Sequence, residues 1–258
     1  MNLDLDGCGV LVTGGSKGIG LACARGFLAE GARVAIASRS EANLSDARAA
    51  LGEVITVAAD LADAAAARAM IDRVEGELGP IDILVASAGA ARRTPPDELT
   101  PAAWRSAMDA KYFTYINVID PLVKLMAARG RGVIVNIVGN GGKVASPIHL
   151  PGGAANAALM LATVGLANTY AATGVRLLAI NPGLTRTTRV SEGMQADAAR
   201  QGISEAEALQ RSIDRIPLGR LAEPEEIAAM AVFAASPRAS YLTGVVITMD
   251  GASSPIVV

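Results

Sequence analysis

Aromatic residues, cysteines and histidines are all scarce in this sequence. Phe, Trp and Tyr make up 3% of the 258 residues, whereas 51% of the chain is hydrophobic, so small aliphatic side chains must form most of the core. The two cysteines, Cys8 and Cys23, stand alone without the paired spacing of a metal site or an evident disulfide role. We expect each to be a small buried apolar residue. Thiol redox chemistry and a metal centre are therefore not expected.

The chain also lacks an excess of charge and a long hydrophobic run. The net charge is −2 and the two signs are interspersed, which argues against nucleic acid as a partner. No stretch reaches the roughly 18 uninterrupted apolar residues of a membrane span, and residues 1–7 show no signal-peptide pattern. We therefore expect no membrane association and a soluble cytoplasmic protein that acts on a small molecule.

Short apolar runs alternate with helical patterns along the whole length, which suits one domain over residues 1–258. Such alternation predicts an α/β fold with a parallel, doubly wound sheet of about seven strands and helices on both faces. The first expected strand ends near residue 12. The other six cover residues 34–37, 54–58, 81–85, 133–138, 175–180 and 245–249. One expected helix begins near residue 19 and another near residue 100. Four more cover residues 41–51, 64–78, 154–172 and 224–235.

A glycine-rich turn joins the first strand to the first helix. Gly14, Gly18 and Gly20 leave this turn almost without side chains, and the helix that follows presents unpaired N–H groups at its start. A ligand can approach the backbone of such a turn closely, and the positive end of the helix dipole attracts anions. The turn is therefore suited to bind a pyrophosphate. The spacing differs from G-x-G-x-x-G, and an ordinary tight strand-to-helix turn remains the alternative.

The end of the second strand carries no acidic residue. In a dinucleotide site an acid at this point binds the ribose 2′-hydroxyl. Here Ser38 and Arg39 take that place, and Lys17 in the first turn can approach the same point. Two cations there would hold a 2′-phosphate, which favours NADP over NAD. The alternative is that both are ordinary solvated charges.

Two later strand ends also point toward the ligand crevice. Asp60 follows the run 54–58, at the sheet edge where ligands bind in this class of fold, and could accept a hydrogen bond from an adenine amino group. Alternatively, Asp60 caps the helix that begins near Ala62. The small residues Ser87, Ala88 and Gly89 would let a ligand approach the backbone closely.

One lysine stands out on an apolar stripe. Trp104, Met108, Lys111 and Tyr115 share one face of the helix that starts near residue 100. A lysine in such a place usually runs along the surface with its ammonium group in water. Residues 184–216 are polar and interrupt the alternation, so we interpret them as a mobile, substrate-covering segment, with a simple surface insertion as the alternative.

Taken together, these stretches closely resemble the short-chain dehydrogenase/reductase family over nearly the whole chain. The resemblance is carried by Thr13–Gly20, Asp60-Leu61, Ser87-Ala88-Gly89, Ile134-Val135-Asn136-Ile137 and Asn181-Pro182-Gly183. It implies a Rossmann-type fold, a nicotinamide cofactor and hydride transfer at a carbonyl or alcohol. Residues 242–251 look like the family's C-terminal region, which is often buried in a tetramer, so a homo-oligomer (tetramer or dimer) is expected.

The resemblance also implies which residues bind the cofactor. Arg39 resembles the family's NADP-selecting arginine. The remaining positions that match the family's cofactor-binding residues are Gly14, Ser16, Lys17, Gly18, Ile19, Gly20, Asp60, Leu61, Ala88, Gly89, Pro182, Gly183 and Thr187.

The family's catalytic asparagine, serine, tyrosine and lysine do not carry over. Their positions fall on Lys111, Gly139, Gly152 and Asn156. Because the ordinary proton donor is missing, one hypothesis is an NADP-dependent oxidoreductase whose donor site is rebuilt around Lys111, with His149 or Asn156 contributing. The alternative, which a lone loop histidine favours, is that His149 is structural or solvated. The second hypothesis is a non-catalytic dinucleotide-binding protein that acts as a sensor or scaffold.

Overall fold

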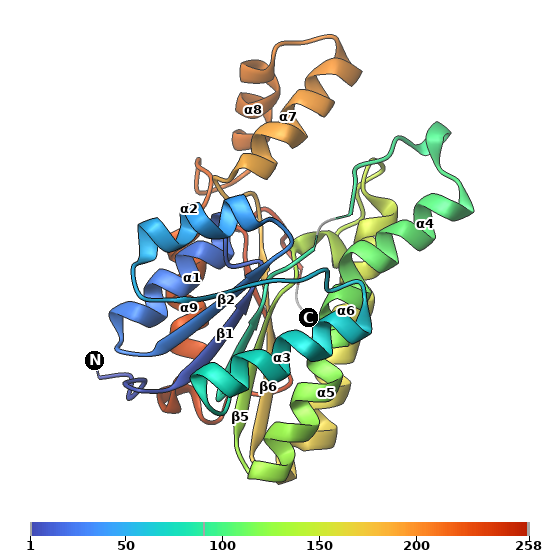
Figure 1. Cartoon of the computed structure of the whole chain (residues 1–258). Helices are drawn as coiled ribbons and strands as arrows, with labels where there is room; N and C mark the ends of the chain where they lie inside the picture. The colour runs from blue at the N-terminus through green and yellow to red at the C-terminus, as the bar shows by residue number, and fades with distance from the viewer. Residues whose placement is uncertain (1, 90, 257–258) are drawn as a thin grey trace.

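The computed structural model describes residues 2–89 and 91–256, and it confirms the doubly wound architecture. Seven parallel strands form one sheet in the order β3-β2-β1-β4-β5-β6-β7 (Figure 1). The strand order reverses between β1 and β4, where ligands of such folds bind beyond the carboxyl ends of the strands. Residues 1, 90, 257 and 258 of the expected domain lie outside the described residues.

The strand boundaries agree with the expected ones to within two residues. The seven strands are β1 (Gly9–Thr13), β2 (Arg33–Ser38), β3 (Ile55–Ala58), β4 (Ile83–Ala86), β5 (Gly132–Ile137), β6 (Val175–Pro182) and β7 (Val246–Met249). Most of their residues are buried, because helices cover both faces of a parallel sheet. The apolar runs of the sequence therefore located every strand.

Helices cover the two faces in two groups (Figure 1). One group consists of α1 (Gly18–Ala29), α2 (Glu41–Leu51) and α9 (Pro224–Ala235), and the other of α3 (Ala64–Leu78), α5 (Thr114–Arg129) and α6 (Leu150–Tyr170). Each group forms its own hydrophobic core against the sheet. The short helix α4 (Pro101–Ala107) leads into α5 through a π-helical turn, Met108–Phe113.

Helix α6 begins four residues before the expected start, because Pro151 and the two glycines after it belong to its first turn. The stretch Leu150–Thr173 is long and apolar enough to cross a membrane by length and composition alone, with a mean hydropathy of 1.4. The same values describe the central helix of a folded domain. Because residues such as Ala155, Leu159 and Ala167 are buried against the sheet, we interpret α6 as a core helix.

Residues 184–216 interrupt the strand–helix alternation, as expected, but they are largely helical. The segment contains α7 (Thr188–Gln201) and α8 (Glu205–Ile213), which stand together above the main body (Figure 1). Met194, Ala198 and Ala208 are buried between these two helices. The pair therefore has a small apolar core of its own.

Candidate functional site

The glycine-rich turn holds the start of α1 open. Lys17 is the N-cap residue of α1 and makes no side-chain capping bond, whereas Ser40 and Asp63 cap α2 and α3 with their side chains. The first N–H groups of α1 are therefore available to an anionic ligand.

Two glycines are required by close backbone contacts. Gly14 has a φ of +68°, and a Cβ atom there would lie 2.7 Å from the carbonyl oxygen of Ser87. A Cβ atom at Gly20 would collide with the carbonyl oxygen of Gly14. Any larger residue would have to move the backbone of the turn, so the turn keeps the open shape that a pyrophosphate needs.

The turn is tied to the end of β2. Ser16 donates a hydrogen bond to Ser38 across 3.0 Å between their hydroxyl oxygens. Lys17 and Arg39 directly follow these two serines, and both are exposed. The two cations thus flank one corner of the sheet, where the sequence predicts a 2′-phosphate.

Asp60 is not the cap of α3. The helix begins at Ala64, and Asp63 caps it by accepting hydrogen bonds from the backbone of Ala65 and Ala66. Asp60 is exposed and accepts a hydrogen bond from the backbone N–H of Ala62 at 3.1 Å. The capping alternative is therefore wrong. Its neighbour Leu61 is 3% exposed and belongs to the core.

The other expected cofactor residues lie along the same sheet edge. Ala88 and Gly89 follow β4, and the Thr13 hydroxyl accepts a hydrogen bond from the backbone N–H of Ala88. Pro182 ends β6, and the N–H of Gly183 donates to Met249 at 2.9 Å. Thr187 lies against the glycine-rich turn. Its methyl carbon is 3.1 Å from the position that a Cβ atom of Gly18 would occupy. Ile19 is half-buried in the first turn of α1.

A cavity of about 1030 Å³ opens beside this edge. Lys111, His149 and Asn156, the three candidate catalytic residues, all line its wall together with Gly139 and Gly152. From the segment 184–216 the lining includes Leu184, Arg189, Gly193, Met194, Ala196, Asp197 and Ser212. The fold thus brings the candidate residues into one space, below α7 and α8.

Lys111 points inward, so the expectation of a surface-running side chain is wrong. It is 7% exposed, and its Nζ donates hydrogen bonds to the Tyr115 hydroxyl at 2.8 Å and to the carbonyl oxygen of Ile137 at 3.3 Å. Within the expected stripe Trp104 is 40% exposed whereas Tyr115 is fully buried, and a π-helical turn at Met108–Phe113 separates the two. Such turns often mark functional sites.

Burial changes the protonation of this pair. Loss of water, with a smaller effect of the Arg189 charge, lowers the pKa of Lys111 to about 7. Burial raises the pKa of Tyr115 well above its ordinary value of 10. The neutral Tyr115 hydroxyl donates to the Ile137 carbonyl and accepts from Lys111. Near neutral pH, Lys111 can therefore either give or take a proton.

The buried lysine should make stability depend on pH. The pKa of Lys111 is about 7 in the folded protein and ordinarily 10.5. Between these values the unfolded chain binds more protons, so the contribution of Lys111 makes the free energy of unfolding rise with pH in that window. We expect urea unfolding of the Lys111→Met variant to show a flatter dependence from pH 7 upward. An identical dependence in both proteins would contradict a buried, easily deprotonated lysine.

His149 fills the space beside Gly152. It is the N-cap residue of α6, and a Cβ atom at Gly152 would collide with its imidazole ring. Burial lowers the pKa of His149, and the charges of Arg93 and Lys111 lower it further. The lowered pKa makes the imidazole mainly neutral at pH 7, and the ring lies against the start of α6.

Asn156 is the third candidate and is 5% exposed. Its Nδ2 lies 3.3 Å from where a Cβ atom of Gly139 would be. Its Oδ1 finds no hydrogen-bond partner within the described residues. A buried amide oxygen without a partner is costly, so a ligand group or water is expected to satisfy it.

Sequence reasoning missed four residues of this site. Tyr115 was expected only as an apolar member of the stripe, although its spacing of four from Lys111 is a signal for contact on a helix. Arg92, Arg93 and Arg189 also line the cavity, and nothing in the local sequence pattern indicated them.

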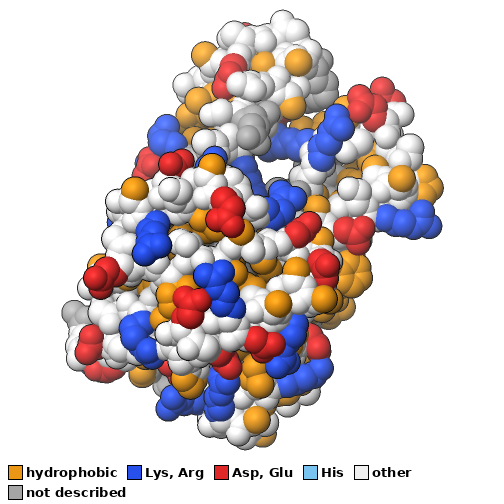
Figure 2. Space-filling model, in the orientation of Figure 1, with side chains coloured by type: hydrophobic (Ala, Val, Ile, Leu, Met, Phe, Trp, Pro, Cys, Tyr) orange, Lys and Arg blue, Asp and Glu red, His pale blue; other side chains and the backbone are white. Residues whose placement is uncertain are grey.

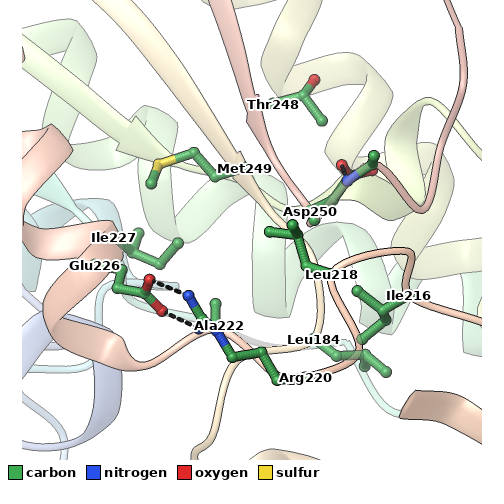
Figure 3. Close-up of a pocket in the computed structure, with 12 residues that line it drawn as sticks. Leu184, Ile216, Leu218, Arg220, Ala222, Glu226, Ile227, Thr248, Met249 and Asp250 are labelled. Carbon is green, nitrogen blue, oxygen red and sulfur yellow. Dashed lines mark hydrogen bonds and ion pairs between the residues drawn. The ribbon is translucent and has the colours of Figure 1, made fainter. Parts of the chain in front are cut away.

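A second, smaller cavity of about 240 Å³ lies nearby and shares Leu184 with the large one. Its lining combines apolar side chains such as Ile216 and Met249 with an ion pair (Figure 3). Arg220 donates two hydrogen bonds of 2.7 Å to the carboxylate of Glu226. Its charge is thus balanced within the protein.

Comparison with known proteins places this geometry in context. The sequence matches the family described as enoyl-(acyl carrier protein) reductase over residues 14–253. Galactitol 2-dehydrogenase (L-tagatose-forming) of Cereibacter sphaeroides is 35% identical over 251 residues, 96% of this chain and 95% of that protein.

Solved structures of other proteins share the fold of this chain. The crystal structure of L-sorbose reductase from Gluconobacter frateurii, complexed with NADPH and L-sorbose, covers 100% of both chains with a TM-score of 0.91 and 29% identity. The structure of actinorhodin polyketide ketoreductase with NADPH has a TM-score of 0.93 and 29% identity, covering 96% of this chain and 98% of that one. The chain therefore belongs to the short-chain dehydrogenase/reductase family.

Proposed function

We propose that this protein is an NADP(H)-dependent oxidoreductase that interconverts a carbonyl compound and its alcohol, with Lys111 as the proton donor. The observation that carries the proposal is the buried Lys111 ammonium at the wall of the cavity, with a pKa lowered to about 7. An ionisable group with a strongly shifted pKa in a large cavity is typical of a catalytic acid or base.

The residues at the sheet edge fit a dinucleotide. The start of α1 and the glycines around it can take a pyrophosphate, because no side chain caps the first N–H groups of the helix. Lys17 and Arg39 flank the place where a 2′-phosphate would lie. Two similar proteins were solved with NADPH, which supports NADP(H) here as well.

In the proposed reduction the hydride for the carbonyl carbon would come from NADPH held at the sheet edge by the turn before α1, Lys17 and Arg39. Lys111 gives its proton to the carbonyl oxygen as the new C–H bond forms, and the neutral amine regains a proton from solvent. In the reverse direction the amine accepts the hydroxyl proton. Tyr115 and the Ile137 carbonyl hold the Lys111 Nζ in place, so Lys111 does not need to reorganise.

Under this proposal the site departs from the family's usual catalytic set. Lys111 and Asn156 stand where the family has an asparagine and a lysine, and glycines stand at the serine and tyrosine positions. His149 occupies the space beside Gly152. We propose that Lys111 replaces the tyrosine as acid and that Asn156 and His149 contact the substrate.

The direct test is NADPH oxidation with a panel of aldehydes, ketones and acyl thioesters, repeated with NADH. Steady turnover with NADPH supports the proposal. Tight NADPH binding without turnover on any compound would instead favour a non-catalytic dinucleotide-binding protein, whose basis is the pair of glycines at the serine and tyrosine positions. Failure to bind either dinucleotide would overturn both functions.

The proposed 2′-phosphate contact predicts a change in cofactor preference. We expect Arg39→Ser to weaken NADPH binding by about 10- to 100-fold, because a charged hydrogen bond contributes roughly 1.5–3 kcal/mol. NADH binding should change little, since it lacks the 2′-phosphate. Fluorescence titration measures both affinities. Arg48→Ser, at the exposed end of α2, is the matched control. Equal losses for the two dinucleotides would show that Arg39 does not contact the phosphate.

A further inference from the structure

The large cavity carries more positive than negative charge. Its described lining includes four cationic side chains, Arg92, Arg93, Lys111 and Arg189, and two acidic ones, Glu98 and Asp197. The whole chain, in contrast, has a net charge of −2. Figure 2 shows Lys and Arg side chains gathered around the hollow beneath the protruding α7 and α8. The positive charge is therefore concentrated at the proposed site.

Internal contacts hold the cavity arginines only loosely. Arg189 donates to the carbonyl oxygen of Gly89 at 3.2 Å, and Arg93 donates to that of Gly193 at 3.4 Å. The nearest approach of Arg93 to the Asp197 carboxylate is 3.7 Å. In the smaller cavity, by comparison, Glu226 engages its arginine through two hydrogen bonds of 2.7 Å. Because a guanidinium has five N–H donors, Arg93 and Arg189 keep donors for a ligand.

The cations also act on their neighbours within the cavity. Arg189 lowers the pKa of Lys111, and Arg93 and Lys111 both lower the pKa of His149. These charged groups are therefore close enough to affect one another electrostatically. A separate observation points to a bound molecule: the buried Oδ1 of Asn156, in the same wall, finds no partner among the residues that the structure describes.

We propose that the substrate of this site carries an anionic group, a carboxylate or a phosphate, which Arg189 and Arg93 bind while the reacting carbonyl faces Lys111. This inference rests on the proposed oxidoreductase function. Guanidinium groups bind both anions through paired hydrogen bonds, and the positive cavity attracts them from solution. The anion also offsets part of the excess positive charge of the lining.

Matched pairs of carbonyl compounds test the inference. Pyruvate is compared with 2,3-butanedione for the carboxylate, and dihydroxyacetone phosphate with dihydroxyacetone for the phosphate. We expect kcat/KM with NADPH to be at least about 10-fold higher for one anionic member than for its neutral partner. The pair that shows the preference identifies which anion the site takes.

Single substitutions assign the preference to the arginines. Arg189→Gln and Arg93→Gln should each reduce it about 10-fold or more, mainly through a higher KM, and leave the affinity for NADPH unchanged. Arg211→Gln removes a cation from α8 that is paired with Glu207 and lies outside the cavity, so it should have no effect. Circular dichroism checks that each variant is folded.

The outcomes separate this inference from the proposed function. Turnover of neutral and anionic members at equal rates, unaffected by Arg189→Gln, overturns the anion site and leaves the oxidoreductase standing. If no compound is turned over, calorimetric titration of pyruvate and inorganic phosphate into the NADPH-bound protein decides. Binding that weakens in Arg189→Gln but not in Arg211→Gln supports the anion site, and no binding by the wild type overturns it.

Discussion

Replacing Lys111 by methionine is expected to lower kcat for carbonyl reduction by about 10²- to 10⁴-fold, the usual contribution of a general acid. Methionine keeps an unbranched side chain of similar length, so the packing against Tyr115 is largely preserved. The substitution removes the proton that Lys111 would give to the substrate oxygen. Steady-state rates with the best NADPH-linked substrate measure the loss.

Two controls distinguish lost chemistry from lost structure. The affinity for NADPH should be unchanged in Lys111→Met, because the expected cofactor residues lie at the turn and strand ends. Lys124→Met removes an exposed lysine of α5 that is paired with Asp120, and it should keep the full rate. If Lys111→Met also keeps the full rate, Lys111 is not the proton donor. If the wild-type protein binds NADPH but shows no activity, the result favours the non-catalytic hypothesis.

Most of the fold could be predicted because its signals are local. Apolar runs in a parallel sheet are covered on both faces, so each strand appears in the sequence as a short hydrophobic segment. The capping residue Thr100, followed by a proline, likewise predicts the start of α4, and its hydroxyl accepts the expected capping bond from Ala103. The helices α7 and α8 were not predicted, since their polar composition resembles that of an exposed loop.

The direction of Lys111 could not be predicted from helical spacing. The stripe through Trp104, Lys111 and Tyr115 assumes 3.6 residues per turn, and the π-helical turn at Met108–Phe113 changes that geometry. The resemblance to the family predicts that Lys111 stands at the position of the catalytic asparagine, and this assignment stays a prediction. The burial of Lys111 emerges only from the packed structure, whereas its contact with Tyr115 is indicated by their spacing of four.

The place of His149 likewise depends on tertiary structure. In the sequence it is a lone histidine three residues before Gly152. In the fold it starts α6, and its ring takes the space that a larger residue at 152 would need. The two arginines of the proposed anion site come from positions 93 and 189, which are distant in sequence. No single stretch of sequence could have shown that they share one cavity.

The pH dependence of the two reaction directions is the second large effect expected. With a pKa of about 7, Lys111 must be protonated to reduce a carbonyl. We expect kcat/KM for reduction to be constant below pH 7 and to fall tenfold per pH unit above it, roughly 100-fold by about pH 9. Oxidation of the alcohol needs the neutral amine, so its kcat/KM should instead fall tenfold per unit below pH 7.

Variants identify the group whose titration causes the inflection of kcat/KM near pH 7. Burial and the charges of Arg93 and Lys111 lower the pKa of His149 below its ordinary 6.5, so His149 titrates at a lower pH than Lys111. His149→Gln should therefore keep the inflection near pH 7, whereas Lys111→Met should lose it in both directions. Tyr115→Phe removes the hydroxyl that accepts a hydrogen bond from Lys111, and it should shift the inflection without abolishing it. An unchanged inflection in Lys111→Met would assign the proton transfer to another group, because a methionine cannot titrate.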